Sequence, residues 1–195
     1  MSTMLITQSP HTDFSSFATA LGLSPSALQQ GLARCQSLEI AAGRPLLAQG
    51  EAQQFGFFLM QGILRACHYS SGGEERCKEF YFPGELCFLY ASWLDKSPAL
   101  YQIETLTPAK LLKVPLSLLD QPDWQVLHLP LLRQQLLYKE QKEALFLLHS
   151  PEERYLALNR LWPHWHQVLS QAQLARYIGI SPISLSRIKR RINLG

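Results

Sequence analysis

Residues 43–86 read GRPLLAQGEAQQFGFFLMQGILRACHYSSGGEERCKEFYFPGEL, a series of short apolar runs separated by glycine, proline and serine. The runs recur roughly every 8 to 12 positions, which is typical of short antiparallel strands joined by turns. The pattern continues on both sides of this stretch. Strands are predicted over 38–41, 46–48, 55–60, 63–69, 77–82, 101–105 and 110–115. The sequence therefore predicts a small antiparallel barrel or double-sheet roll.

Helical patterns lie on both sides of the strands. Before them, Asp13 is the expected cap of one short helix and Ser24-Pro25 the start of a second. After them, Pro130 can begin a long helix that runs to about His149. Its apolar residues are Leu131, Leu132, Leu136, Leu137, Ala144, Leu145, Phe146 and Leu148. This width can bury one side against the roll and another against a partner helix, so we expect a dimer; a single helix packed in the core is the alternative.

The last 25 residues carry a concentrated positive charge. Residues 171–195 hold five cations and no acidic residue, whereas the whole chain has a net charge of only +3. The preceding residues therefore sum to −2. A mildly acidic body with a basic end is typical of a protein that docks one end onto a polyanion.

The apolar order within this tail predicts two short helices and a tight turn. Ser170 and Gln173 form a capping-box pattern that starts the first helix. Gly179 stands where a helix ends in a left-handed residue, and Ser181-Pro182 starts the second helix. The arrangement resembles the helix-turn-helix of bacterial transcription regulators, whose second helix enters the major groove of DNA. A small helical hairpin with a solvated basic face is the alternative.

Side-chain chemistry suggests how such a second helix would contact DNA. Arg187 can offer a planar fork to a guanine edge, and Ile183 can touch a thymine methyl group. We expect base contacts from Arg187, Ile183 and Ser184, and phosphate contacts from Ser181, Ser186, Lys189, Arg190 and Arg191. The phosphate contacts supply affinity but carry no sequence information.

Residues 36–190 together resemble the CRP/FNR family of transcription regulators. The resemblance rests on Gly50-Glu51, the FFLMQG strand that ends at Gly62, the Ser-Gly-Gly hairpin at 71–73, and Gly84-Glu85. It implies an α+β fold with an N-terminal cyclic-nucleotide-binding-like β-roll (a jelly roll with flanking helices), a long dimerisation helix and an all-α helix-turn-helix. It also implies a homodimer on a pseudo-palindromic DNA operator, with RNA polymerase as a further partner.

Two departures from the family pattern affect the expected function. Nucleotide-binding members carry a Gly-Glu pair and a later Arg that hold the ribose and the cyclic phosphate. The matching positions here are Phe88, Leu89, Ala99 and Leu100, and no Arg lies between 86 and 101. We therefore predict no cofactor and no ordinary binding of cyclic AMP, because a buried phosphodiester needs a cationic partner. The chain also stops at Gly195, which suggests a shortened branch of the family that lacks the usual β-wing.

The region that replaces the nucleotide cassette is apolar and aromatic. Its residues are Phe88, Leu89, Tyr90, Trp93, Leu100 and Tyr101. Two interpretations are open: collapse into ordinary core, or a pocket for a small apolar effector.

The cysteines and histidines offer weaker signals. The last three of the four cysteines (Cys35, Cys67, Cys77 and Cys87) recur every ten residues, as successive strands would place them. Free buried thiols are the expected state, and redox or metal sensing is the alternative. His164 and His166 bracket Trp165 in an expected surface segment rather than a metal site.

These patterns define the expected organisation of the chain. We assign 1–129 to the β-roll sensor domain, 130–149 to the dimerisation helix, and 150–195 to the DNA-binding domain, with a hinge at 149–151. No nucleophile–base motif or phosphate loop appears, so no enzyme is expected. No apolar run spans a membrane, and no basic leader precedes Arg34, so a cytoplasmic protein is expected. The alternative function is a protein-interaction or apolar-ligand sensor module that does not read DNA.

Overall fold

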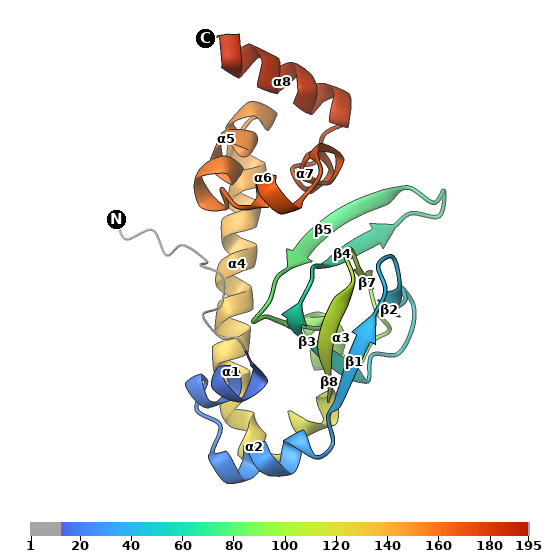
Figure 1. Ribbon diagram of the computed structural model, residues 1–195, viewed down its shortest axis with the longest axis vertical. Coiled ribbons are helices and arrows are strands. Elements are labelled where there is room, and N and C mark those ends of the chain that lie inside the picture. Colours follow the sequence, from blue (N-terminus) through green and yellow to red (C-terminus); the bar gives the residue numbers. More distant parts are fainter. Residues whose placement is uncertain (1–12, 195) are drawn as a thin grey trace.

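The computed structural model describes residues 13–194. A long helix, α4 (His128–Leu148), runs beside a β-roll (Figure 1). The two N-terminal helices pack near the start of α4, and the C-terminal helices gather around its far end (Figure 1). None of the described helices is long and apolar enough to cross a bilayer.

The roll consists of two four-stranded antiparallel sheets, ordered β1-β8-β3-β6 and β2-β7-β4-β5. Its strands are β1 (Gln36–Ile40), β2 (Pro45–Leu47), β3 (Phe55–Gln61), β4 (Leu64–Tyr69), β5 (Glu75–Tyr81), β6 (Leu86–Cys87), β7 (Gln102–Thr105) and β8 (Ala109–Pro115). Every predicted strand is present, and the double-sheet roll is confirmed. The short β6 was not predicted; it pairs with Phe57 and Phe58 of β3.

The described helices before α4 are short. They are α1 (Phe14–Ala20), α2 (Pro25–Leu32), α3 (Tyr90–Asp95) and the 3-10 turns η1 (Leu116–Leu118) and η2 (Pro122–Leu127). Asp13 and Ser24 cap the first two as predicted, because their side chains accept the N–H groups of Ser16 and Ala27. The helix α3 was missed, because no side chain caps its start at Leu89.

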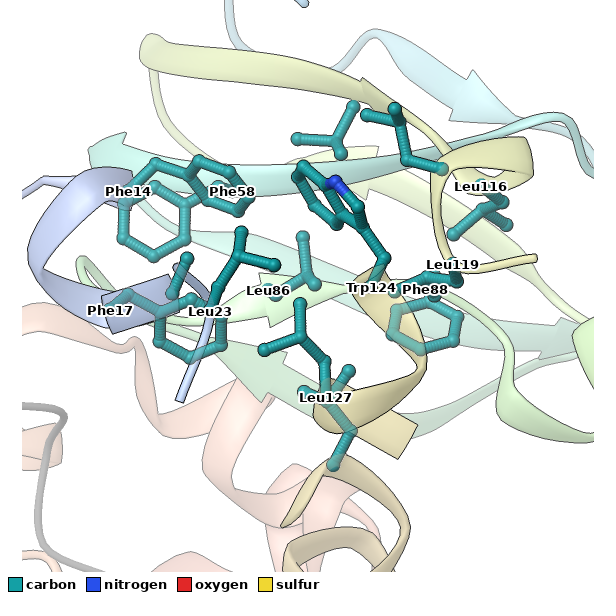
Figure 2. Close-up of a cluster of buried hydrophobic side chains, with 14 of the residues drawn as sticks. Phe14, Phe17, Leu23, Phe58, Leu86, Phe88, Leu116, Leu119, Trp124 and Leu127 are labelled. Carbon is teal, nitrogen blue, oxygen red and sulfur yellow. The ribbon is translucent and has the colours of Figure 1, made fainter. Parts of the chain in front are cut away.

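The N-terminal helices close one face of the roll through an aromatic cluster (Figure 2). Phe14 packs edge-on against Phe58 of β3 at a centroid distance of 5.4 Å and stacks on Trp124 at 6.3 Å. Trp124 is fully buried, and its ring lies against Gly31, where a β-carbon would overlap it. This cluster joins α1, α2, β3 and η2 into one core, which fixes the start of α4.

A second core joins the roll to the C-terminal helices α5 (Pro151–Leu161), α6 (Trp165–Val168), α7 (Gln171–Tyr177) and α8 (Pro182–Leu194). The backbone breaks out of helical geometry at His149 (φ −121°, ψ 140°), within the predicted hinge at 149–151. Although the chain changes element there, Phe80 and Phe82 of the roll lie in one buried cluster with Trp165 and Tyr177. The C-terminal helices are therefore docked on the roll.

Candidate nucleic-acid interface

Helices α7 and α8 are joined by a turn whose geometry follows from its residues. At the start of α7, Ser170 N–H donates to Gln173 Oε1 (2.6 Å) and Gln173 N–H donates to Ser170 Oγ (3.3 Å), which completes the predicted capping box. At its end, Gly179 has φ +77°. The N–H groups of Gly179 and Ile180 donate to the carbonyls of Arg176 and Ala175, which is the Schellman arrangement. The turn therefore supplies hydrogen-bond donors to the last carbonyls of α7 and changes the direction of the chain.

The inner side of α8 packs as predicted. Leu185 is fully buried and Ile188 nearly so, in the cluster that holds Leu174, Ala175 and Ile178. Because Ala175 has only a methyl group, the two helices can approach closely. These contacts hold α8 in one orientation relative to α7.

The outer side of α8 carries the residues expected to contact DNA. The exposed ones are Ser181, Ile183, Ser184, Ser186, Arg187, Arg190 and Arg191, while Lys189 is half-buried. Ile183 exposes 67% of its surface, which is unusual for an isoleucine. Helix α8 lies at one end of the molecule (Figure 1). All eight residues thus lie on one accessible helix.

The hydroxyl and cationic groups on α8 differ in whether they already have partners within the protein. Ser181 caps the helix, since Ser184 N–H donates to its Oγ (3.1 Å) and the two hydroxyls lie 2.9 Å apart. Arg191 is ion-paired with Glu152 of α5. Within the described part of the chain, no ion pair is seen for Arg187, Lys189 or Arg190. These three cations are therefore the most available positive charges on the helix.

The opposite side of the C-terminal helices is held by the roll through charge and aromatic contacts. One carboxylate oxygen of Glu75, on β5, accepts both Arg65 of β4 (2.9 Å) and Arg176 of α7 (2.8 Å). Phe82 stacks on Trp165 at a centroid distance of 5.5 Å, and Phe80 lies 5.8 Å from Tyr177. Sequence reasoning missed this docking because the paired residues lie about a hundred positions apart.

A single arginine hydrogen-bonds to the segments on both sides of the hinge. Arg154, in the first turn of α5, donates to the carbonyls of Phe146 (2.7 Å), His149 (3.0 Å) and Ile178 (3.3 Å). Its guanidinium also lies 4.6 Å from the centre of the Phe146 ring. These carbonyls are at the ends of α4 and α7, where helices leave acceptors unpaired. Arg154 therefore fixes the angle between the long helix and the C-terminal helices.

A positively lined cavity lies between β5, α4 and α7. Its volume is about 520 Å³, and its cationic lining comes from Arg76, Lys78, Lys139, Lys142 and Arg176. Lys142 Nζ lies 3.9 Å from the centre of the Tyr177 ring and donates to the carbonyl of Lys78. Burial lowers the pKa of Lys142 to about 8, despite the opposing charge of Glu79. This cavity was not predicted, because its lining comes from elements distant in sequence.

The six residues proposed for an effector pocket do not line one cavity. Phe88, Tyr90 and Trp93 belong to the core beneath the N-terminal helices, with Phe88 stacked on Tyr90 at 4.1 Å. Leu89 and Tyr101 belong to the core between the sheets. Leu100 is 56% exposed. The arrangement agrees with the interpretation that this segment collapses into ordinary core.

The histidines flanking Trp165 are less exposed than expected. His164 packs edge-on against Phe82 (5.6 Å) and His166 against Tyr155 (5.7 Å), so both are half-buried. The segment lies at the surface as predicted, with Pro163, Gln167 and Val168 exposed, but Trp165 at its centre is buried against the roll. Across residues 13–194 no group of His, Cys, Asp and Glu is arranged to hold a metal ion.

Comparison with known proteins identifies the roll. The family model described as "Cyclic nucleotide-binding domain" matches residues 37–121. This part of the chain is therefore similar to a cyclic nucleotide-binding domain. The match covers the sheets and the turns that the sequence singled out. No curated protein sequence matches the chain.

Solved structures extend the likeness beyond the cyclic nucleotide-binding domain. The c-di-GMP-responsive global regulator CLP of Xanthomonas campestris has a TM-score of 0.70 at 14% identity, over 88% of this chain and 92% of that chain. A Eubacterium rectale protein described as a transcriptional regulator of the CRP/FNR family has a TM-score of 0.71 at 14% identity, covering 88% and 84%. The Thermus thermophilus catabolite activator protein is 26% identical, with a TM-score of 0.52, covering 88% and 84%. The resemblance to CRP/FNR regulators and the α+β architecture are confirmed, and these neighbours are regulatory proteins rather than enzymes.

The positions of the roll that the resemblance assigns to a cyclic nucleotide carry apolar side chains. Phe88, Leu89 and Ala99 are buried where the resemblance places the ribose and phosphate partners. The other Gly-Glu pair, Gly84-Glu85, is used by its own turn, because Glu85 accepts Phe82 N–H at 2.8 Å. Burial also raises the pKa of Glu85 to about 8. The side chains present do not fit a cyclic phosphate.

Proposed function

We propose that the protein is a homodimeric, sequence-specific DNA-binding transcription regulator that does not respond to cyclic AMP. The observation that carries the proposal is the outer side of α8, where Arg187, Lys189 and Arg190 are presented beside an exposed Ile183. A rigid helix with unpaired cations at the end of a molecule can enter the major groove. The regulatory names of the structural neighbours support the same function.

Within this proposal, Arg187 reads a base and the other cations bind the backbone. Arg187 is exposed one turn beyond Ile183, so both face the same side of α8. A guanidinium can bond a guanine in two places, and the isoleucine can contact a thymine methyl group. Lys189 and Arg190 supply phosphate contacts, and Arg191 joins them by exchanging Glu152 for a phosphate. The phosphate contacts thereby fix the position of the helix on the DNA, and only a few side chains recognise the base sequence.

The test begins with selection of binding sites from random DNA by the full chain, followed by titration of the selected and a scrambled duplex. We expect Arg187→Ala to weaken binding to the selected duplex by about 1–3 kcal/mol and to change binding to the scrambled duplex little. The matched control is Arg160→Ala, which removes the same charge from an exposed position on α5. Equal losses for Arg187→Ala on both duplexes would contradict a role in base reading. If no duplex is enriched at all, the DNA-binding proposal itself fails.

The proposed insensitivity to cyclic AMP has a separate test. A ligand that binds only the native state stabilises it and so raises the melting temperature. At a ligand concentration of a hundred times its Kd, the free energy of unfolding rises by about 2.7 kcal/mol. We expect millimolar cyclic AMP to leave the melting temperature of this protein unchanged, because Phe88, Leu89 and Ala99 offer no partner to its phosphate. A dose-dependent rise in the melting temperature would show that the domain retains nucleotide binding.

A further inference from the structure

Two of the four cysteines lie directly opposite each other on adjacent strands. Cys67 of β4 pairs with Cys77 of β5 in the antiparallel ladder. All four cysteines are free. Opposed residues of an antiparallel pair share one face, with α-carbons about 4.5–5.5 Å apart. That separation lies within the range of about 4.4–6.8 Å that a disulfide spans, so the two sulfurs can bond with little backbone movement.

The two thiols are not equivalent. Both are buried, but Cys67 exposes none of its surface, whereas Cys77 exposes 9% and lines the positively lined cavity between β5, α4 and α7. Lys142 lines the same cavity. The neighbouring Cys67 thiol lowers the pKa of Cys77 and the charge of Lys142 lowers it further, while burial opposes both. The neighbouring Cys77 thiol, together with burial, raises the pKa of Cys67. Cys77 is therefore the nucleophile that small reagents reach, and Cys67 is the thiol behind it.

We propose that Cys67 and Cys77 form a peroxide-sensitive dithiol, in which Cys77 reacts first and Cys67 resolves the product into a disulfide. In the first step the Cys77 sulfur attacks one oxygen of hydrogen peroxide, the O–O bond breaks, and one water leaves with the protons of the thiol and the peroxide. Cys77 is then a sulfenic acid. In the second step the Cys67 sulfur attacks the Cys77 sulfur, the S–O bond breaks, and a second water leaves. The two thiols lose two electrons, and the peroxide is reduced to two waters.

The other two cysteines serve as internal controls. Burial raises the pKa of Cys35, which is half-buried beside Gly31, and its Sγ donates to the carbonyl of that glycine. Burial raises the pKa of Cys87 well above its usual range, and this side chain is fully enclosed between the sheets. The structure gives neither of them a thiol neighbour across the ladder. Both are expected to stay reduced while the pair oxidises.

The dithiol lies in the core that joins the roll to the C-terminal helices. Cys67 and Cys77 share their buried cluster with Ala175 and Tyr177 of α7. A bond between the two sulfurs crosslinks β4 and β5 in the cluster that they share with α7. Oxidation therefore changes the contact between the roll and the helices that follow the hinge, and not the outer surface of the roll.

The experiment treats the reduced full-length protein with hydrogen peroxide, alkylates the remaining thiols and maps the peptides by mass spectrometry. We expect a disulfide between the Cys67 and Cys77 peptides, with Cys35 and Cys87 alkylated. Because this measurement uses the unaltered protein, it stands even where a cysteine variant folds poorly. Oxidation of Cys35 or Cys87 at the same rate as the pair, or links only between molecules, would overturn the proposal.

Variants then separate the two roles. In Cys67→Ser the reaction stops at the sulfenic acid, so Cys77 is labelled by dimedone; in Cys77→Ser no cysteine is labelled at a comparable rate. Cys87→Ser is the matched control and keeps the disulfide. Lys142→Met slows the oxidation of Cys77 and shifts the midpoint of its pH–rate profile to higher pH, which a purely structural role for Lys142 would not do. A folded Cys67→Ser protein without label at Cys77 would contradict the order of the steps.

Discussion

At the scale of single residues, Lys142 is the clearest case of a side chain that lowers the stability of the fold. Its ammonium is buried beneath Tyr177, and within the described residues its hydrogen-bond partner is the carbonyl of Lys78 rather than a carboxylate. A buried cation without a carboxylate at hydrogen-bond distance is costly, and replacement by an apolar side chain of similar shape is often stabilising. The position suits a chemical task better than a structural one, as its place beside Cys77 suggests.

This cost predicts a pH-dependent stability difference between the wild type and Lys142→Met. The pKa of Lys142 is about 8 in the folded protein, and that of an unfolded lysine is about 10.4. Below pH 8 both states are protonated and the full penalty applies, so the variant should be more stable by about 1–2 kcal/mol. As pH rises from 8 towards 10.4, only the unfolded state keeps its proton, wild-type stability rises, and the difference shrinks. Urea unfolding at pH 7 and pH 10 measures this difference in the free energy of unfolding between the two proteins.

The control for this pH effect is Lys139→Met, on the same helix. Lys139 also lines the cavity, and burial lowers its pKa, but its side chain is exposed. We expect a much smaller stability difference at pH 7. A Lys142→Met protein that is less stable than the wild type at pH 7, or a difference that does not change with pH, would contradict the assignment.

At the scale of elements, Arg154 decides how the C-terminal helices sit on α4. Arg154→Ala leaves the last carbonyls of α4 and α7 without their donor, and we expect a loss of about 2–3 kcal/mol in the free energy of unfolding. Hydrogen–deuterium exchange should quicken in α5 and α7 and stay unchanged in β3. The exposed Arg160→Ala, on the same helix, should change neither quantity. Uniformly faster exchange across the roll would instead indicate general destabilisation.

The elements also show how far the sequence could predict this fold. Strands and capped helices were found because glycine turns, alternating apolar runs and Ser170-type caps are local signals. The helix α3 and the two-residue β6 were missed because neither has a cap or a repeat long enough to read. Helix α8 was placed with its buried and exposed sides correct. The Glu75–Arg176 contact depends on long-range packing, which no local pattern encodes.

At the scale of the whole molecule, α4 presents a second apolar surface that lies exposed among the described residues 13–194. Leu129, Leu136 and Leu147 are 75%, 60% and 74% exposed. At 3.6 residues per turn they lie on one side of the helix, opposite the buried Leu131 and Leu145. Arg133 and Glu140 are exposed along the same side, where opposite charges can pair between two helices. The surface therefore has the pattern of a helix–helix contact between two copies of the chain.

This pattern predicts that the protein is a dimer that one charge on α4 can separate. Leu136→Lys places an ammonium at the centre of the apolar surface, and we expect it to shift the sedimenting species from dimer to monomer. Because Leu136 is exposed within one chain, the monomer should keep the wild-type circular dichroism spectrum. Leu94→Lys, at a 58% exposed leucine on α3, is the matched control and should remain dimeric. A two-fold symmetric operator needs two copies of α8, so the monomeric variant should also lose affinity for the full operator more than for a half-site. A wild-type protein that sediments as a monomer at every concentration would reject α4 as the interface.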